Sequence, residues 1–380
     1  MNKALAGSRS SGSCFYTKGA VNIVKFLRLL IRIRKFLGNG KTNGENVYVA
    51  DRTGFYKKMW ENASTKLGVR LETISDDFWQ IRKESRKVRI NNYKVPLDDP
   101  VTLSLAGEKA LCYRLLSQVD IPIPEYAVYT IANIDEGIRF LTSKGGPFVV
   151  KPSSGTSAAR GVSVGIRNYR DFIWATALAS LYGNRIIIEK MIAGELYRLL
   201  FLENKMIHAA RRTGIRVRGD GTSSLALLIE RTLMKDKGKP VQKNTLMKKD
   251  KDLQNTLNYQ HLSIENVPMA GQQVLVKSLP IGDRGDPESI ARYTENVTEQ
   301  LCPNIIETAR KAVVKLGIIF AGVDLITTDP TAPLGDVGGA VIEVNSTPGL
   351  HHHYNLKNQP VEKQPAEIVL KYLLSENSRI

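Results

Sequence analysis

Cysteine is scarce in this 380-residue sequence. Cys14, Cys112 and Cys302 lie far apart, and no two of them form a CxxC pair. This spacing favours neither a disulfide framework nor a zinc site built on cysteines. We therefore expect three free thiols in a reducing compartment, and hence a cytoplasmic protein.

Long apolar runs are also lacking. No stretch of about 18 uninterrupted apolar residues occurs, which argues against a membrane-spanning helix. The hydrophobic fraction of 42% is nevertheless sufficient for a chain of this length to bury a substantial core. The length itself predicts two or three domains.

Acidic residues are missing from the first 44 positions, which hold nine of the Lys and Arg residues and about half of the net charge of +17. Within them, 21–37 reads VNIVKFLRLLIRIRKFL. Its basic residues recur every three or four positions, which places them on one face of a predicted helix. Three interpretations stay open: a helix that contacts an anionic membrane surface, an organelle-targeting leader, or a basic helix packed on the body of the protein.

Several signatures of common functional classes are absent. The sequence has no GxxxxGK[ST] phosphate loop, no RNP, KH or zinc-finger signature, and no convincing Ser-His-Asp or Cys-His arrangement. Without the first 44 residues, the chain keeps a modest positive charge, which suits phosphate and carboxylate ligands. We do not expect a nucleic acid as its partner.

Composition and periodicity divide the chain into four parts. After the basic leader at 1–44, we expect a small α/β unit at 45–104, a central subdomain at 105–192 and a C-terminal subdomain at 193–375. Alternating strands and helices predict an α/β or α+β fold.

Individual elements follow from the same patterns. The small α/β unit is predicted to open with a strand at 46–50 and a helix at 52–67. Another helix is expected at 105–119, and the Lys- and Asn-rich stretch 235–260 is typical of a solvated insertion or mobile loop. Further strands are predicted at 69–74, 147–152, 162–166, 185–192, 197–202, 205–211, 320–327 and 340–345, and further helices at 169–182 and 304–316.

The predicted C-terminal hairpin carries the most informative local pattern. In its second strand, AVIEVN, strict alternation places Val341, Glu343 and Asn345 on one face. Symmetric pairing puts Asp324 opposite residue 344, beside both polar side chains. Two carboxylates and an amide oxygen suit Mg²⁺, and close like charges need a cation between them. A hydrogen-bonded polar cluster at a strand end is the alternative.

A second signal is Lys151, followed by the small-residue loop SSGTSAARG at 153–161. Its glycines let backbone N–H groups approach an anion, its hydroxyls add donors, and the lysine supplies a charge from a rigid strand. From the residues alone, a plain strand–turn–strand with a solvated lysine is an equally good interpretation.

Arginine and histidine clusters give weaker signals. Arg198, Arg211 and Arg212 could clamp a carboxylate or phosphate, as arginine forks do, or each could form a surface salt bridge. The His triplet at 351–353 suggests a metal site, but successive residues point in different directions, so that at most two could share an ion.

The order of these stretches along the chain resembles the ATP-grasp superfamily. The sequence is similar to the ATP-grasp portion of cyanophycin synthetases over roughly Glu108 to Tyr354. The most specific stretch is AGVDLITTDPTAPLGDVGGAVIEVNSTPGL, and Gly-Asp-Gly at 219–221 favours the cyanophycin-synthetase branch. The resemblance does not extend to the Mur-ligase-like domain of those enzymes. We therefore expect that this chain alone does not complete a two-amino-acid polymerising cycle.

The resemblance implies an ATP-grasp fold in which two α+β subdomains hold ATP between them. It implies a ligase that depends on ATP and two Mg²⁺ ions, with Mn²⁺ as an alternative ion, and that joins a carboxylate to an amine through an acyl phosphate. The implied substrates are a small acid and an amine, either an amino acid or a short peptide. A homo-oligomer stays open, since the family often forms dimers or tetramers.

Roles for individual residues are also implied by the resemblance. The implied catalytic residues are Arg212, Arg198 and Lys151, and the implied metal ligands are Asp324, Glu343 and Asn345. The residues implied in ATP binding are Lys109, Lys151, Ser153, Ser154, Gly155, Thr156, Gly161, Glu189, Lys190, Ile192 and Glu195. Leu196 stands where the family usually has an acidic residue in contact with ribose. This departure supports an alternative function, a non-catalytic protein that binds nucleotide and regulates a partner.

Overall fold

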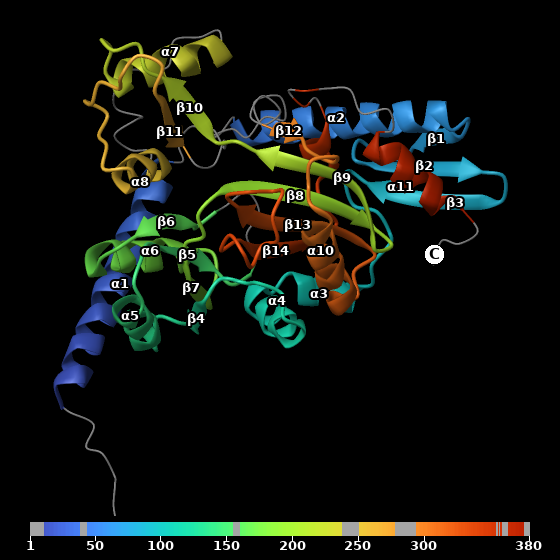
Figure 1. Cartoon of the computed structure of the whole chain (residues 1–380). Helices are drawn as coiled ribbons and strands as arrows, with labels where there is room; N and C mark the ends of the chain where they lie inside the picture. Colours follow the sequence, from blue (N-terminus) through green and yellow to red (C-terminus); the bar gives the residue numbers. More distant parts are fainter. Residues whose placement is uncertain are drawn as a thin grey trace, which may run out of the picture. The chain divides into compact units, whose positions relative to one another are not determined.

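The computed structural model describes residues 11–38, 44–154, 160–237, 251–277, 294–354, 356, 358 and 364–375. The chain forms two compact units. Unit 1 combines Met1–Lys41 with Glu125–Met191, and unit 2 combines Thr42–Pro124 with Ile192–Ile380. Figure 1 shows the elements of both units along the chain.

Unit 1 is built on a four-stranded antiparallel sheet in the order β4–β7–β5–β6. Its strands are β4 (Tyr126–Tyr129), β5 (Phe148–Pro152), β6 (Ser163–Ile166) and β7 (Ile186–Lys190). Helices α5 (Ile134–Ser143) and α6 (Tyr169–Ala179) pack on this sheet. The apolar run of β7 is buried throughout, and the strand predicted at 185–192 is confirmed over Ile186–Lys190.

The basic N-terminal segment is helical, as predicted. Helix α1 (Ser11–Gly38) packs against α6 and α5 within unit 1. Ala20 and Val24 are buried in the core of that unit, and Leu27 and Ile31 pack against it. Their spacing of four, three and four residues defines one helical face, which therefore rests on the body of unit 1. In the described part of the chain, no helix is long and apolar enough to cross a membrane.

Unit 2 centres on a five-stranded antiparallel sheet in the order β12–β9–β8–β13–β14. Its strands are β8 (Glu195–Leu202), β9 (Lys205–Arg212), β12 (Thr294–Asn296), β13 (Phe320–Thr327) and β14 (Ala340–Ser346). Glu203 and Asn204, both with positive φ, form the two-residue turn of the predicted hairpin between β8 and β9.

The two faces of this sheet are covered by different helices (Figure 1). Helix α10 (Pro303–Leu316), which ends at Gly317 as predicted, packs on Leu199 and Val323. Leu200 and Phe320 point to the opposite face. They join a core formed by α2 (Gly44–Lys66), α11 (Pro365–Leu373) and the antiparallel sheet β1 (Arg70–Thr73), β2 (Phe78–Lys83) and β3 (Arg86–Asn91).

The strand predicted at 46–50 was wrong, because α2 runs without interruption through these residues. Tyr56, Trp60 and Ala63, at helical spacing, bury one face of α2. The β-branched and aromatic residues of NVYVA express only a weak preference for strand, which this packing overrides.

The single helix predicted at 105–119 is divided into α3 (Pro100–Ala106) and α4 (Lys109–Leu116). Asp99 caps α3 by accepting hydrogen bonds from two backbone N–H groups. An aspartate followed by proline is a helix-start signal that the sequence contains. The break at Gly107 makes a lysine the first residue of α4.

The interpretation of 235–260 as a solvated insertion was wrong in its second half. Residues 238–250 lie outside the described residues, but Leu253 and Leu257 are buried one helical turn apart. They belong to a small core formed by α7 (Leu225–Lys237), α8 (Lys251–Tyr259), β10 (Ile215–Arg218) and β11 (Gln273–Lys277). The prediction missed this leucine pair because the many lysines and asparagines around it give the segment a polar average composition.

Candidate active site

The predicted metal ligands converge at one place on β13 and β14. Asp324 lies directly opposite Glu343, one residue away from the predicted partner at 344. Asn345 follows two positions later, and its Nδ2 donates a hydrogen bond of 3.3 Å to Oδ2 of Asp324. The hairpin therefore brings two carboxylates and an amide together, on the face of the sheet opposite α10.

A β-bulge interrupts the regular pairing of β13 with β14 beside Asp324. Asp324 pairs with Glu343, but Leu325 pairs with Val341, so Ile342 is the extra residue of β14. Val341 consequently points into the core on the α10 side, where Leu325 also lies. The prediction that Val341 shares a face with Glu343 was therefore wrong, because strict alternation does not hold across a bulge.

Arg198 neutralises the first of the two carboxylates. Its Nε and Nη2 donate hydrogen bonds of 2.6 and 2.5 Å to the two carboxylate oxygens of Asp324. Both residues are buried, with relative exposures of 9% and 3%. Burial works against the charge of the guanidinium, but Asp324 more than offsets this effect and raises the pKa of Arg198.

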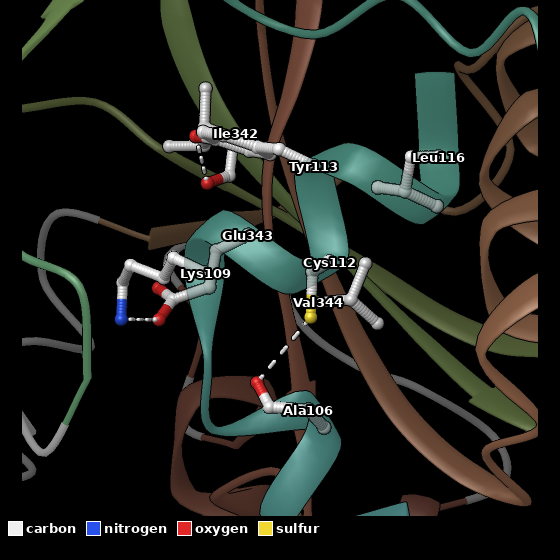
Figure 2. Close-up of a pocket in the computed structure, with 8 residues that line it drawn as sticks. All are labelled: Ala106, Lys109, Cys112, Tyr113, Leu116, Ile342, Glu343 and Val344. Atoms are coloured by element: carbon white, nitrogen blue, oxygen red, sulfur yellow. Dashed lines mark hydrogen bonds and ion pairs between the residues drawn. The ribbon is translucent and has the colours of Figure 1, made fainter. Parts of the chain in front are cut away.

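Lys109 neutralises the second carboxylate. Its Nζ lies 2.8 Å from Oε1 of Glu343 (Figure 2). Helix α4 is held on β14 by Tyr113, whose hydroxyl donates a hydrogen bond of 2.7 Å to the backbone carbonyl of Ile342. Cys112 lines a small pocket together with Lys109 and Glu343, and burial raises the pKa of its thiol to about 11. The bulge and α4 together position the lysine over the carboxylate.

These residues provide a donor set that fits magnesium. Within the described residues, no group of three His, Cys, Asp or Glu side chains could hold a metal ion, so a metal site here needs the amide oxygen of Asn345 beside Asp324 and Glu343. Directly opposed carboxylates are unfavourable without positive charge nearby. Arg198 and Lys109 supply that charge, and a divalent cation among hard oxygen donors would serve the same electrostatic purpose.

Arg212 is the most unusual cation of this region. It ends β9, and its Nε and Nη2 are buried without a hydrogen-bond partner among the described residues. Burial, and then the like charge of Arg198, lower its pKa. A buried guanidinium in this condition is stabilised when an anion pairs with it.

A group of buried histidines adjoins the arginines, and sequence reasoning missed its connections. Tyr56 on α2 contacts Nδ1 of His351 at 2.6 Å. Nδ1 of His353 lies 2.9 Å from Nδ1 of His208 on β9, and the ring of His352 lies 3.8 Å from that of His351. Burial lowers the pKa of each of these histidines. His351 and His353 thus have different partners, and no local signal in the sequence predicts these contacts.

Unit 1 contains a second group of predicted site residues. Nζ of Lys151 on β5 lies 2.8 Å from Oε1 of Glu189 on β7, and these side chains are 7% and 6% exposed. Ser153 is buried directly after β5, and Ser154 is half-buried. The predicted site residues Gly155 and Thr156 lie outside the described residues.

The end of the same loop is tightly packed. Gly161 has a φ of 75°, and a Cβ built on it would lie 2.7 Å from the ring of Tyr182. Glycine is therefore required here for both conformation and space.

Lys190, at the end of β7, is bound to Glu125 in two ways. Its backbone N–H donates to the backbone carbonyl of Glu125 at 2.8 Å, and its ammonium group donates to the carboxylate Oε1 at 3.3 Å.

The remaining two predicted residues lie in unit 2. Ile192 is half-buried in the segment before β8. Glu195 begins β8 and forms ion pairs with Arg216 at 2.9 Å and Arg211 at 3.5 Å. The predicted ATP-binding residues are thus distributed over both units: Lys151 and Glu189 lie together in unit 1, whereas Lys109 and Glu195 in unit 2 pair with different residues.

Comparison with known proteins gives the following similarities. No family model matches the chain. The cyanophycin synthetase of Trichormus variabilis is 27% identical over 255 residues, which cover 66% of this chain and 27% of that protein. The glutathione biosynthesis bifunctional protein GshAB of Listeria welshimeri is 24% identical over 335 residues, which cover 83% of this chain and 40% of that protein. The chain therefore spans about a quarter of the length of the cyanophycin synthetases that it matches.

The fold has a counterpart among solved structures. The crystal structure of a bifunctional glutathione synthetase from Pasteurella multocida matches with a TM-score of 0.50 and 21% identity, and the match covers 80% of this chain and 42% of that one. These similarities show that the chain has an ATP-grasp fold and is similar in sequence to the cyanophycin synthetases.

Proposed function

We propose that this protein is an ATP- and Mg²⁺-dependent ligase that joins a carboxylate to an amine through an acyl phosphate. The observation that carries the proposal is the convergence of Asp324, Glu343 and Asn345 with Arg198 and Lys109 on the β8–β13–β14 sheet. Phosphoryl transfer to a carboxylate brings two anions together, and a site of this composition offsets their repulsion.

In this proposal, the ATP-binding roles are assigned residue by residue, as the resemblance implies. Lys109 and Lys151 hold its phosphates, and the loop at 153–161 supplies backbone and hydroxyl donors. Glu189, Lys190 and Ile192 contact the adenine, a role that rests on the resemblance alone. The buried Lys151–Glu189 pair supports the proposal for the phosphates, because it keeps the ammonium group fixed on a rigid strand.

Asp324, Glu343 and Asn345 would hold two Mg²⁺ ions, which supply positive charge that stabilises the transferring phosphoryl group. Arg198 fixes the orientation of Asp324 through two hydrogen bonds. The unpaired donors of Arg212 then provide a place for the acyl phosphate, whose charge satisfies the buried guanidinium.

The bonds change in two steps. A carboxylate oxygen of the acid attacks the γ-phosphorus of ATP, and ADP leaves. The amine nitrogen then attacks the acyl carbon, phosphate leaves, and the nitrogen loses a proton to give the amide. No covalent enzyme intermediate is needed, and preorganised charge accounts for the larger part of the rate. We propose small acids, with amino acids or short peptides as amines.

The test is mass spectrometry of the products that form from a mixture of amino acids and small acids when ATP and Mg²⁺ are present. An amide product together with ADP is expected from the native protein. Asp324→Asn and Glu343→Gln should both abolish it, and Glu307→Gln, which changes a surface carboxylate on α10, should not. Unchanged turnover in both site variants would contradict the proposal.

A second candidate is a non-catalytic nucleotide-binding protein that regulates a partner. It is favoured by Glu195, whose carboxylate is engaged by Arg211 and Arg216, while its neighbour Leu196 cannot accept a hydrogen bond from ribose. Tight ATP binding without ADP formation in the same substrate mixture would support this candidate instead.

A further inference from the structure

Helix α1 exposes a continuous apolar surface that does not contribute to the core. Its five large apolar side chains with relative exposures between 43% and 59% are Ile23, Phe26, Leu29, Leu30 and Ile33. We call them the outer stripe. At 100° per residue they occupy a sector about 120° wide. Isolated exposed apolar residues are common on protein surfaces, but a contiguous stripe marks an interaction site.

The stripe is separate from the face by which α1 packs on unit 1. Ala20, Val24, Leu27 and Ile31 form that packed face. The helix is therefore already anchored to the body, and the apolar residues of the outer stripe are in excess of what this packing requires.

A basic flank runs beside the outer stripe. Lys18, Lys25, Arg28 and Arg32 lie in the sector between the stripe and the packed face, and all except Arg28 are exposed. The first 44 residues contain no acidic residue that could neutralise them. The pKa of Arg28 is lowered, mainly by its own burial and in addition by the nearby charge of Arg32.

We propose that α1 docks this protein on an anionic lipid surface. The helix lies parallel to the surface, with the outer stripe among the upper acyl chains and the basic flank among the headgroups. A bilayer with anionic headgroups complements both features at once. A second copy of the chain is less suitable, since it would bring one basic flank near another. The proposal is independent of the ligase function.

The experiment is sedimentation of the full chain with vesicles of phosphatidylcholine alone, or of phosphatidylcholine with roughly a third phosphatidylglycerol. The native chain is expected to bind the anionic vesicles at least about tenfold more strongly than the neutral ones, and to be released as salt rises. Phe26→Ser combined with Leu30→Ser should lower binding to the anionic vesicles by about tenfold or more, and so should Lys25→Glu combined with Arg32→Glu. Ile74→Ser, at an exposed apolar position of unit 2, is the matched control and should bind like the native chain.

Three outcomes would overturn the proposal. The first is that the native chain fails to bind anionic vesicles. The Phe26→Ser/Leu30→Ser variant binds as strongly as the native chain, which would show attraction of basic residues to anions without docking of the stripe. The native chain forms a dimer in light scattering that this variant loses, which would assign the stripe to self-association. Circular dichroism of each variant checks that the fold is retained.

Discussion

Arg198 on β8 and Asp324 on β13 are direct cross-strand partners, and their side chains are joined by two hydrogen bonds in the buried layer of the sheet. Removing one partner of such a pair leaves an uncompensated buried charge. The arginine thus allows the carboxylate to remain in place when no metal ion is bound. With Asp324 as a proposed metal ligand, this relationship predicts that the stability of the protein and its metal binding depend on each other.

Replacing Arg198 by methionine should therefore lower the free energy of unfolding by about 3–5 kcal/mol when Mg²⁺ is absent. Addition of Mg²⁺ with ATP should restore a large part of the loss, because a cation then pairs with Asp324. Thermal unfolding with and without Mg²⁺ measures both effects. Arg216→Met, which breaks a half-exposed pair with Glu195, should cost less than about 1 kcal/mol and show no such rescue. An equal Mg²⁺ effect in the two variants would show that Asp324 is not a metal ligand.

Lys109 and a metal ion are expected to compete for Glu343. We predict that Lys109→Met strengthens the binding of Mn²⁺, used as a paramagnetic substitute for Mg²⁺, and weakens the binding of ATP. The physical reason is that the ammonium group of Lys109 pairs with the carboxylate of Glu343 at 2.8 Å, where a metal ion would also bind. Electron paramagnetic resonance and calorimetry measure the two affinities. Lys66→Met, which removes a surface pair with Glu367, is the control. A variant in which both affinities fall would contradict the competition.

Substitutions at the Lys151–Glu189 pair distinguish an effect on stability from an effect on nucleotide binding. Lys151→Met should destabilise the protein by about 3–5 kcal/mol, because it removes the cation that lies 2.8 Å from a buried carboxylate. Adding Glu189→Leu should recover most of this loss, since an apolar pair can replace a buried ion pair. Neither variant should bind a non-hydrolysable ATP analogue in calorimetry. Binding like that of the native chain in the double variant would remove Lys151 from the proposed site.

The buried histidines predict a loss of stability in mild acid. Burial lowers the pKa of His208 to about 4, from an ordinary value of 6.5. Between these two pH values the unfolded chain binds more protons than the folded one, so stability is full above about pH 6.5 and falls as the pH drops towards 4. This one group can account for as much as about 3 kcal/mol.

Urea unfolding between pH 4 and 8 measures this dependence. His208→Gln should flatten the acid limb of the profile, whatever its effect on the absolute stability. His261→Asn changes an exposed turn residue and should leave the slope unchanged. An identical slope in the His208 variant and the native chain would show that protonation of His208 does not contribute.

The elements that depend on local patterns could be predicted from the sequence. The helix before Gly317, the hairpin around Glu203 and Asn204, and the strands of the C-terminal hairpin follow from periodicity and turn residues. The convergence of Asp324 with Glu343 also followed, because consecutive strands that pair with each other bring residues on either side of their connecting loop together.

What could not be predicted depends on contacts between distant parts of the chain. The Arg198–Asp324 pair spans 126 positions and the Tyr56–His351 contact spans 295. No periodicity records such distances. The helical state of 46–50 was missed because α2, to which these residues belong, packs through Tyr56 and Trp60 on residues near the other end of the sequence. The register shift was missed because alternation assumes a ladder without bulges.

The bulge at Ile342 also affects how the protein behaves towards other chains. β14 is the outermost strand of its sheet, and outer strands offer unpaired backbone groups for aggregation. Here the carbonyl of Ile342 is occupied by Tyr113, and the N–H of Val341 donates to the carbonyl of Pro122. The sheet edge that carries Glu343 and Asn345 therefore cannot accept another strand at its centre. These polar groups remain accessible to small molecules, but the edge does not act as a template for fibres.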